Sequence, residues 1–298
     1  RGACKTTDAH FDRAKNMGHF LKALVPYLDV DPFRRPPTLK NPSRDYAYLQ
    51  KLVFTLRQEM KVGETDVIEF EDLIGQYDDA QAIIIPVMWG RKTKHENALH
   101  IHLPESKTTW VYLNLDVRPH DFKFWMAHEL GHALSIEMLA SGDVDTAEDF
   151  ADAFAGALLF PEPLAEAAYS GYANTSSERE RNACLFHYAR EHAISPNSVM
   201  HEIRNYAKAY EKPCVEPEKL YQAIARLNKL VPDVSGQLFS TRPSADHFMR
   251  VTQEVFQTPF FKALGEYIRE QNPSRSIVAT LMGVSPFDAD AFLEALKG

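Results

Sequence analysis

The residues with the clearest chemical potential form one short run, in which His128 and His132 stand four positions apart and Glu129 follows the first histidine. On an α-helix, positions i and i+4 share a face, so the two imidazoles can bind one metal ion together. A carboxylate next to the first ligand can act on water at that ion. Catalytic Zn²⁺ takes two such histidines, one further protein ligand and a water. The H-E-x-x-H run therefore predicts a zinc site with Glu129 as the general base.

A site of this kind needs a third protein ligand, and Glu148 is our candidate. It lies in a stretch, 145–161, that reads as a helix. In one group of zincins the third ligand is a Glu on a following helix, and an acid one turn later supports a ligand histidine. Asp152 occupies that later position. Two alternatives stay open: Glu148 could instead close a capping box with Asp145, and Asp149 could be the ligand, although it points about 100° away from Asp152.

The two blocks together resemble the ImmA/IrrE metallopeptidases. The first block reads HELGHAL from His128, and the second reads EDFADAFAGALLFP from Glu148. The family usually has Glu-Ala-Asn before its Phe-Ala pair, whereas this chain has Phe-Ala-Asp ending at Asp152, which keeps an acceptor and adds a charge. The resemblance covers about residues 45–210. It implies a zinc-dependent endopeptidase fold, and members typically cut a cognate helix-turn-helix repressor to release stress, phage or mobile-element genes.

The elements around these blocks predict an α+β fold of the zincin kind, with a small twisted sheet before the metal helix and a mostly helical C-terminal module. Apolar or alternating runs predict strands at 82–88, 98–103 and 109–115. Pro86 suggests an edge or a bulge in the first strand. The metal helix should cover 122–140, with Asp121 as its N-cap and a stop at Ser141-Gly142. Its core-facing residues are expected to be Phe124, Met126, Leu130, Leu134 and Met138.

Other helices are expected on both sides of this core. The remaining predicted helices are 8–28, 44–60, 163–170, 177–193 and 196–210. A Pro-rich linker at 29–43 separates the first two. We expect three parts: an N-terminal helix and linker at 1–44, the metallopeptidase domain at 45–213, and a regulatory or partner-binding module at 214–298. The core candidates in the last part are Phe239, Phe248, Phe256, Phe260, Phe261, Tyr267, Phe287 and Phe292.

Composition and charge indicate which cellular compartment and which kind of partner to expect. The chain has 298 residues, a net charge of −8 and three cysteines, Cys4, Cys184 and Cys214, which are too scattered for a disulfide framework. Neither a signal peptide nor a membrane span is expected, and cytoplasmic residence is the simplest expectation. Residues 61–214 carry 13 basic and 25 acidic side chains. This excess of acid could attract a basic protein such as a DNA-binding repressor, or serve solubility alone.

Alternatives remain for several residues and for the function. His100 and His102 could hold a second metal ion, but two solvated histidines are the simpler interpretation. Candidates for stabilising the oxyanion are Tyr172, His187, His192, His201 and Arg204. The chain could also be a catalytically weak zincin-fold regulator that binds a repressor or toxin. A DNA-binding regulator is a further alternative, because helix-turn-helix spacing occurs at 189–203 and around Gly283, although the acids after Gly283 would repel phosphates.

Overall fold

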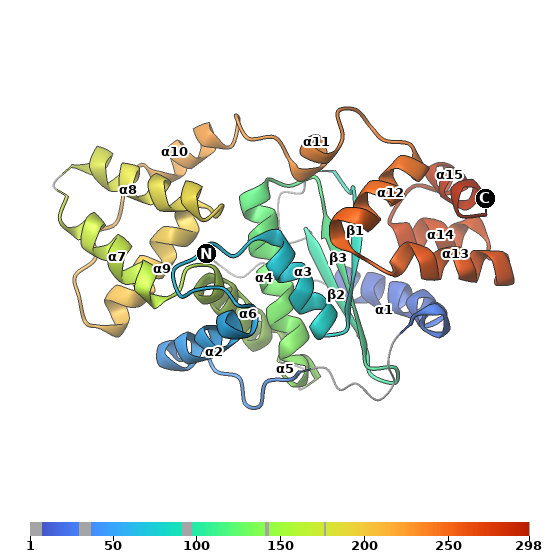
Figure 1. Cartoon of the computed structure of the whole chain (residues 1–298), viewed down its shortest axis with the longest axis horizontal. Helices are drawn as coiled ribbons and strands as arrows, with labels where there is room; N and C mark the ends of the chain where they lie inside the picture. The colour runs from blue at the N-terminus through green and yellow to red at the C-terminus, as the bar shows by residue number, and fades with distance from the viewer. Residues whose placement is uncertain (1–7, 30–36, 91–96, 141–142, 176, 298) are drawn as a thin grey trace. The chain divides into compact units, whose positions relative to one another are not determined.

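The computed structural model describes residues 8–29, 37–90, 97–140, 143–175 and 177–297, and these residues form the predicted α+β fold (Figure 1). The strands are β1 (Ala82–Val87), β2 (Ala98–Leu103) and β3 (Thr108–Asn114). The helices up to residue 159 are α1 (Asp8–Lys22), the 3-10 helix η1 (Val25–Tyr27), α2 (Tyr46–Glu59), α3 (Phe70–Asp79), α4 (Pro119–Leu134), α5 (Ile136–Ala140) and α6 (Val144–Leu159). The later helices are α7 (Glu162–Ala173), α8 (Glu178–Glu191), α9 (Pro196–Ala209), α10 (Leu220–Leu227), α11 (Val234–Leu238), α12 (Ala245–Phe256), α13 (Phe260–Gln271), α14 (Arg275–Met282) and α15 (Pro286–Lys297).

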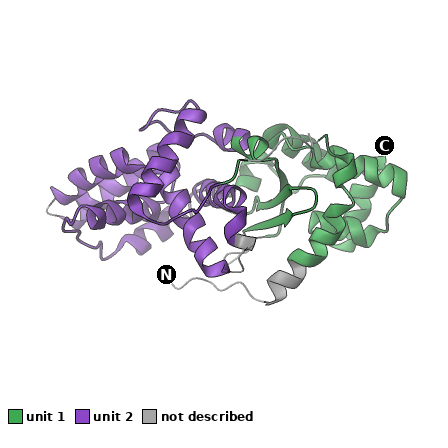
Figure 2. Cartoon of the chain, turned by 90° about the horizontal axis from the view of Figure 1, so that it is seen from below, with its two compact units in different colours: residues 1–38, 76–117, 233–298 green, residues 39–75, 118–232 purple. Residues whose placement is uncertain are grey.

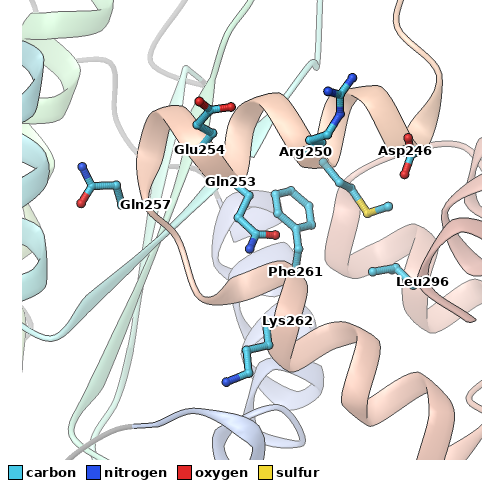
Figure 3. Close-up of a pocket in the computed structure, with 9 residues that line it drawn as sticks. Asp246, Arg250, Gln253, Glu254, Gln257, Phe261, Lys262 and Leu296 are labelled. Carbon is cyan, nitrogen blue, oxygen red and sulfur yellow. The ribbon is translucent and has the colours of Figure 1, made fainter. Parts of the chain in front are cut away.

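The chain divides into two compact units, which Figure 2 shows in green and purple. Unit 1 contains residues 1–38, 76–117 and 233–298, and unit 2 contains residues 39–75 and 118–232. Each unit therefore combines stretches that are distant in the sequence. These units are defined by contacts within the fold, whereas the three parts predicted from the sequence, divided at residues 44 and 213, are separate domains. The three-domain division therefore stays a prediction.

The sheet of unit 1 has the strand order β1-β3-β2. β2 and β3 form the predicted antiparallel hairpin, with His100 opposite Val111, while β1 runs parallel to β3. Every residue of β3 is buried. β1 lies at one edge of the sheet, where Pro86 pairs in register with Leu113, and this confirms the expectation for that proline. Two parallel strands must be joined by a long connection. Here β1 and β3 are separated in the sequence by residues 88–107, which include β2.

The helices α12–α15 bury most of the predicted aromatic core of unit 1. The buried members are Phe239, Phe248, Phe256, Phe260, Phe261 and Phe292. Tyr267 is only half-buried. The prediction for Phe287 was wrong, because this side chain is 85% exposed. It stands in the first turn of α15, directly after Pro286.

The turn between α14 and α15 has the predicted glycine at its corner. Gly283 has φ +62°, and a Cβ at this position would lie 2.2 Å from Nε1 of Trp89, so both the backbone and the packing require glycine. Two acids of α15 are engaged with bases: Asp288 pairs with Arg242 at 3.0 Å and Asp290 with Arg275 at 3.3 Å. Among the described residues, no single helix is long and apolar enough to cross a membrane. α14 and α15 pass that test only as a pair bent by 99°.

Unit 2 is helical and holds two buried cations. Arg57 of α2 is 1% exposed, and its Nη1 donates to the carbonyl of Leu158 at 2.8 Å, which joins α2 to the end of α6. Lys123 of α4 is also 1% exposed, and its Nζ donates to the carbonyl of His192 at 2.8 Å. Burial lowers the pKa of Lys123 to about 8. Each cation satisfies backbone oxygens at a helix end, so both fix how the helices of unit 2 meet.

Two predictions about helices need correction. The predicted helix 8–28 ends at Lys22 and is followed by the short η1, because Pro26 cannot continue an α-helix. In addition, α3 was not predicted from the sequence; it is only ten residues long. Its start is capped by Asp72, whose Oδ2 accepts from the amide of Glu69 at 2.7 Å.

Candidate metal centre

The helix that carries H-E-x-x-H, α4, begins three residues earlier and ends six residues earlier than predicted. Its N-cap is Arg118, with Pro119 at the first helical position, so the expected cap, Asp121, lies inside the first turn. Proline suits this position because its missing N–H would have no helical partner there. At the other end, Ser135 leaves the helical conformation and its hydroxyl donates to the carbonyl of Gly131 at 2.7 Å. The predicted single helix is therefore two helices, α4 and α5; the expected stop at Ser141-Gly142 lies outside the described residues.

The second block forms α6, which packs closely along α4. Gly131 permits this approach, because a Cβ there would lie 2.9 Å from Cδ1 of Phe154 and 3.2 Å from Cα of Ala151. The helix begins one turn before Glu148. Its N-cap is Asp143, whose carboxylate accepts from the amide of Thr146 at 3.1 Å. The capping-box alternative, Asp145 with Glu148, is therefore wrong, and the Glu148 side chain faces α4 instead.

The two predicted ligand histidines and Glu148 come together where these helices cross. The Nε2 atoms of His128 and His132 lie 3.1 Å apart. Oε1 of Glu148 lies 3.2 Å from Nε2 of His132, and its Oε2 lies 3.4 Å from Nε2 of His128. The ligand atoms of the three residues all lie within 4.8 Å of one another, so the group could hold a metal ion. Two buried imidazoles and one carboxylate are a donor set that suits zinc.

Two further acids of α6, Asp152 and Asp149, lie in different environments. Oδ1 of Asp152 lies 2.9 Å from Nδ1 of His128, the nitrogen that faces away from the other donors. The carboxylate therefore orients this ring and keeps Nε2 available as a ligand atom. Asp149, the alternative ligand, forms an ion pair with Arg44 on the surface. The structure thus directs Glu148 towards both histidines and Asp149 away from them.

Burial and hydrogen bonding act in opposite directions on the charges of this cluster. Burial lowers the pKa of His128, but its hydrogen bonds to Asp152 and Glu148 outweigh that effect and raise the pKa to about 10. Burial would raise the pKa of Glu148, but the hydrogen bonds to both histidines hold it well below its usual range. Glu129 is 4% exposed, and burial raises the pKa of its carboxyl. His128 and Glu148 therefore each stabilise the charged form of the other.

Two aromatic side chains that the sequence analysis did not assign to the site lie against His128. The ring of Trp125 lies 5.2 Å from the His128 ring between centroids, at an interplanar angle of 71°. The ring of Phe124 lies 6.3 Å away, tilted by 38°. Phe124 was predicted to face the core, yet both side chains are only half-buried. The i+3 and i+4 spacing to His128 was the signal that could have identified them.

The five candidates for an oxyanion-stabilising role lie in different settings. The hydroxyl of Tyr172 donates to the carbonyl of Val215 at 2.7 Å. Arg204 is paired with Glu216, His187 lies 3.6 Å from Glu191, and the buried ring of His192 contacts Phe160. His201 hydrogen-bonds to Glu202, which raises its pKa, and the charge of Asp152 acts in the same direction.

The other histidine pair of the sequence analysis lies in the sheet. Nδ1 of His102 is 3.1 Å from the hydroxyl of Thr109, and burial lowers the pKa of His102. Within the described part of the chain, the group of three residues suited to a metal ion is His128, His132 and Glu148.

Comparison with known proteins finds a family model that matches the part of the chain holding this arrangement. Residues 81–204 match the Peptidase M78 family model, described as an IrrE N-terminal-like domain. The matched part runs from the residue before β1 into α9 and includes every residue of the candidate metal centre. No curated protein matches the chain.

Proposed function

We propose that this protein is a zinc-dependent endopeptidase whose substrate is a helix-turn-helix transcriptional repressor. The proposal starts from the family match of residues 81–204, which supports membership of the ImmA/IrrE metallopeptidases. The observation that carries the peptidase proposal is the convergence of His128, His132 and Glu148 beside the buried carboxyl of Glu129. A site used only for structural zinc is usually closed by four protein ligands, whereas three protein ligands leave a position for the reactants.

The roles of the chain's own residues follow from this arrangement. His128, His132 and Glu148 would hold the zinc ion, and Asp152 would keep the His128 ring in the required tautomer. The bound ion would supply Lewis acidity at the scissile carbonyl and lower the pKa of the attacking water. Glu129 would take the proton of that water and deliver it to the leaving amine.

The repressor is proposed from the family resemblance and from charge. The segment 61–214 has 25 acidic and 13 basic side chains, and a DNA-binding protein is usually basic. Attraction between the two would raise the rate of encounter. Cleavage would then switch on the genes that the repressor holds silent, with stress, phage or mobile-element genes as the expected class.

The first test is Glu129→Gln, which keeps the size of the side chain and removes its ability to carry a proton. We expect about one zinc per chain in both proteins, and a fall in the cleavage rate of about 10²- to 10⁴-fold in the variant. The substrates would be purified helix-turn-helix repressors encoded beside this gene, followed by electrophoresis and mass spectrometry. Glu137→Gln, an exposed glutamate on α5, is the matched control and should cleave normally.

Unchanged cleavage by Glu129→Gln would overturn the proposed mechanism. Tight binding of a repressor by the zinc-loaded wild-type protein, with no cleavage, would support the alternative of a zincin-fold regulator. A shift of DNA in a gel at moderate salt would support a DNA-binding function.

A further inference from the structure

The aromatic pair beside the metal centre differs from the other apolar residues of α4. Phe122, Met126 and Leu130 are at most 2% exposed and lie in the core of unit 2. Phe124 and Trp125 are only half-buried. Large aromatic side chains stabilise a fold most when they are buried. Two half-buried aromatic side chains beside a proposed ligand histidine therefore leave apolar surface that a bound molecule could cover.

The pair and His128 form one cluster of three rings. The centroids of Phe124 and Trp125 lie 6.0 Å apart at an interplanar angle of 79°, and both rings are in contact range of His128. Because His128 is a proposed ligand, both rings lie about one turn of α4 from the proposed metal centre. The two half-buried rings therefore offer apolar surface close to the proposed metal centre.

We propose that Phe124 and Trp125 line the subsite that receives the substrate side chain next to the scissile bond, so that the enzyme prefers an apolar residue there. This inference rests on the proposed peptidase function. Partly exposed aromatic faces bind aliphatic and aromatic side chains through burial of apolar area and through ring contacts. An acidic substrate residue would be disfavoured, because the side chains of Glu148 and Asp152 are 37% and 55% exposed beside the same histidine.

The test uses decapeptides that differ only in the two residues flanking the central bond, with Leu, Phe, Ala, Lys or Asp at each position. Zinc-loaded wild-type protein should cleave the Leu and Phe peptides with kcat/KM at least about tenfold above the Ala peptide. Trp125→Ala should remove most of this preference, and Trp125→Phe should restore part of it. Phe124→Ala gives an independent reading of the same surface.

The matched control is Phe54→Ala, which removes an aromatic side chain that is 47% exposed on α2. It should leave both the preference and the rate unchanged. Zinc content and zinc affinity are measured for every variant. A loss of zinc affinity with an equal fall in kcat/KM for all peptides would overturn the proposal, since the rings would then only support His128.

Calorimetric titration of the same peptides into zinc-loaded Glu129→Gln separates this inference from the proposed function. Selective binding of Leu and Phe peptides that disappears on adding Trp125→Ala supports the subsite even if the wild-type protein cleaves none of them. Cleavage by the wild-type protein with no preference for apolar residues would overturn the subsite and leave the peptidase function intact.

Discussion

At the scale of single residues, the contact between Asp152 and His128 orients the first proposed ligand. Nδ1 of His128 lies 2.9 Å from this carboxylate, which turns Nε2 towards Glu148 and His132. Carboxylates in this position raise the basicity of the ligand ring and fix its orientation. An Asn oxygen at position 152 could accept the same hydrogen bond without the charge.

Removal of this hydrogen bond should weaken zinc binding. We expect Asp152→Ala to lower zinc affinity by about 10- to 100-fold, and Asp152→Asn to lower it less, because the amide oxygen still accepts from His128. The measurement is competition with a chromophoric chelator at fixed pH. Asp149→Asn on the same helix is the control, because its ion pair with Arg44 is on the surface and should matter little. Equal affinities for Asp152→Ala and Asp149→Asn would contradict the assignment.

At the scale of elements, the site depends on how closely α4 and α6 approach each other. Both histidines are on α4, while Glu148 and Asp152 are on α6, so the distances between donors are set by the packing of two helices. Gly131 lies between the two histidines in the sequence and faces Phe154 and Ala151. A side chain at this position would push α6 outwards and move its acids away from the imidazoles.

Gly131→Ala should therefore destabilise unit 2 and impair its metal site. We expect a loss of about 1–3 kcal/mol in the free energy of unfolding, as is typical of overpacking, together with reduced zinc affinity. Gly75→Ala in α3 is the matched control, because a Cβ there meets nothing within 4 Å and alanine favours a helix by about 1 kcal/mol. Urea unfolding of the three proteins measures the difference. A stability of Gly131→Ala at or above that of wild type would show that the helices can separate without cost.

At the scale of the whole molecule, charge is unevenly distributed along the chain. The net charge is −8, although residues 1–60 carry 11 basic and 6 acidic side chains. The acidic excess belongs to the stretch that holds the candidate site. Exposed charges that attract a partner over a distance are screened by salt, with a Debye length of about 8 Å at physiological ionic strength.

Cleavage of a basic repressor should therefore depend on ionic strength through binding. Between low and about 0.5 M salt we expect KM for the repressor to rise several-fold while kcat stays nearly constant, because screening weakens the encounter but leaves the buried donors unaffected. A short uncharged peptide with the same cleavage sequence is the control and should show little change in KM. Equal salt effects on both substrates would indicate that charge does not recruit the repressor.

The sequence by itself determined the features that depend on neighbours along the chain. The i, i+4 spacing of His128 and His132 places both on one face of any helix, and alternation or apolar runs located all three strands to within one residue at each end. The two motif blocks also indicated the family. Such features could be predicted because backbone periodicity, not packing, sets the direction of these side chains.

Only the tertiary structure decided how separate elements meet. It placed Glu148 beside both histidines and Asp149 in an ion pair with Arg44. It also showed that Asp143, and not Asp145 with Glu148, caps α6. It also left Phe124 and Trp125 half-buried with their rings beside His128. These outcomes depend on which helix faces pack together, and packing is set by contacts between residues far apart in the sequence, which no local pattern records.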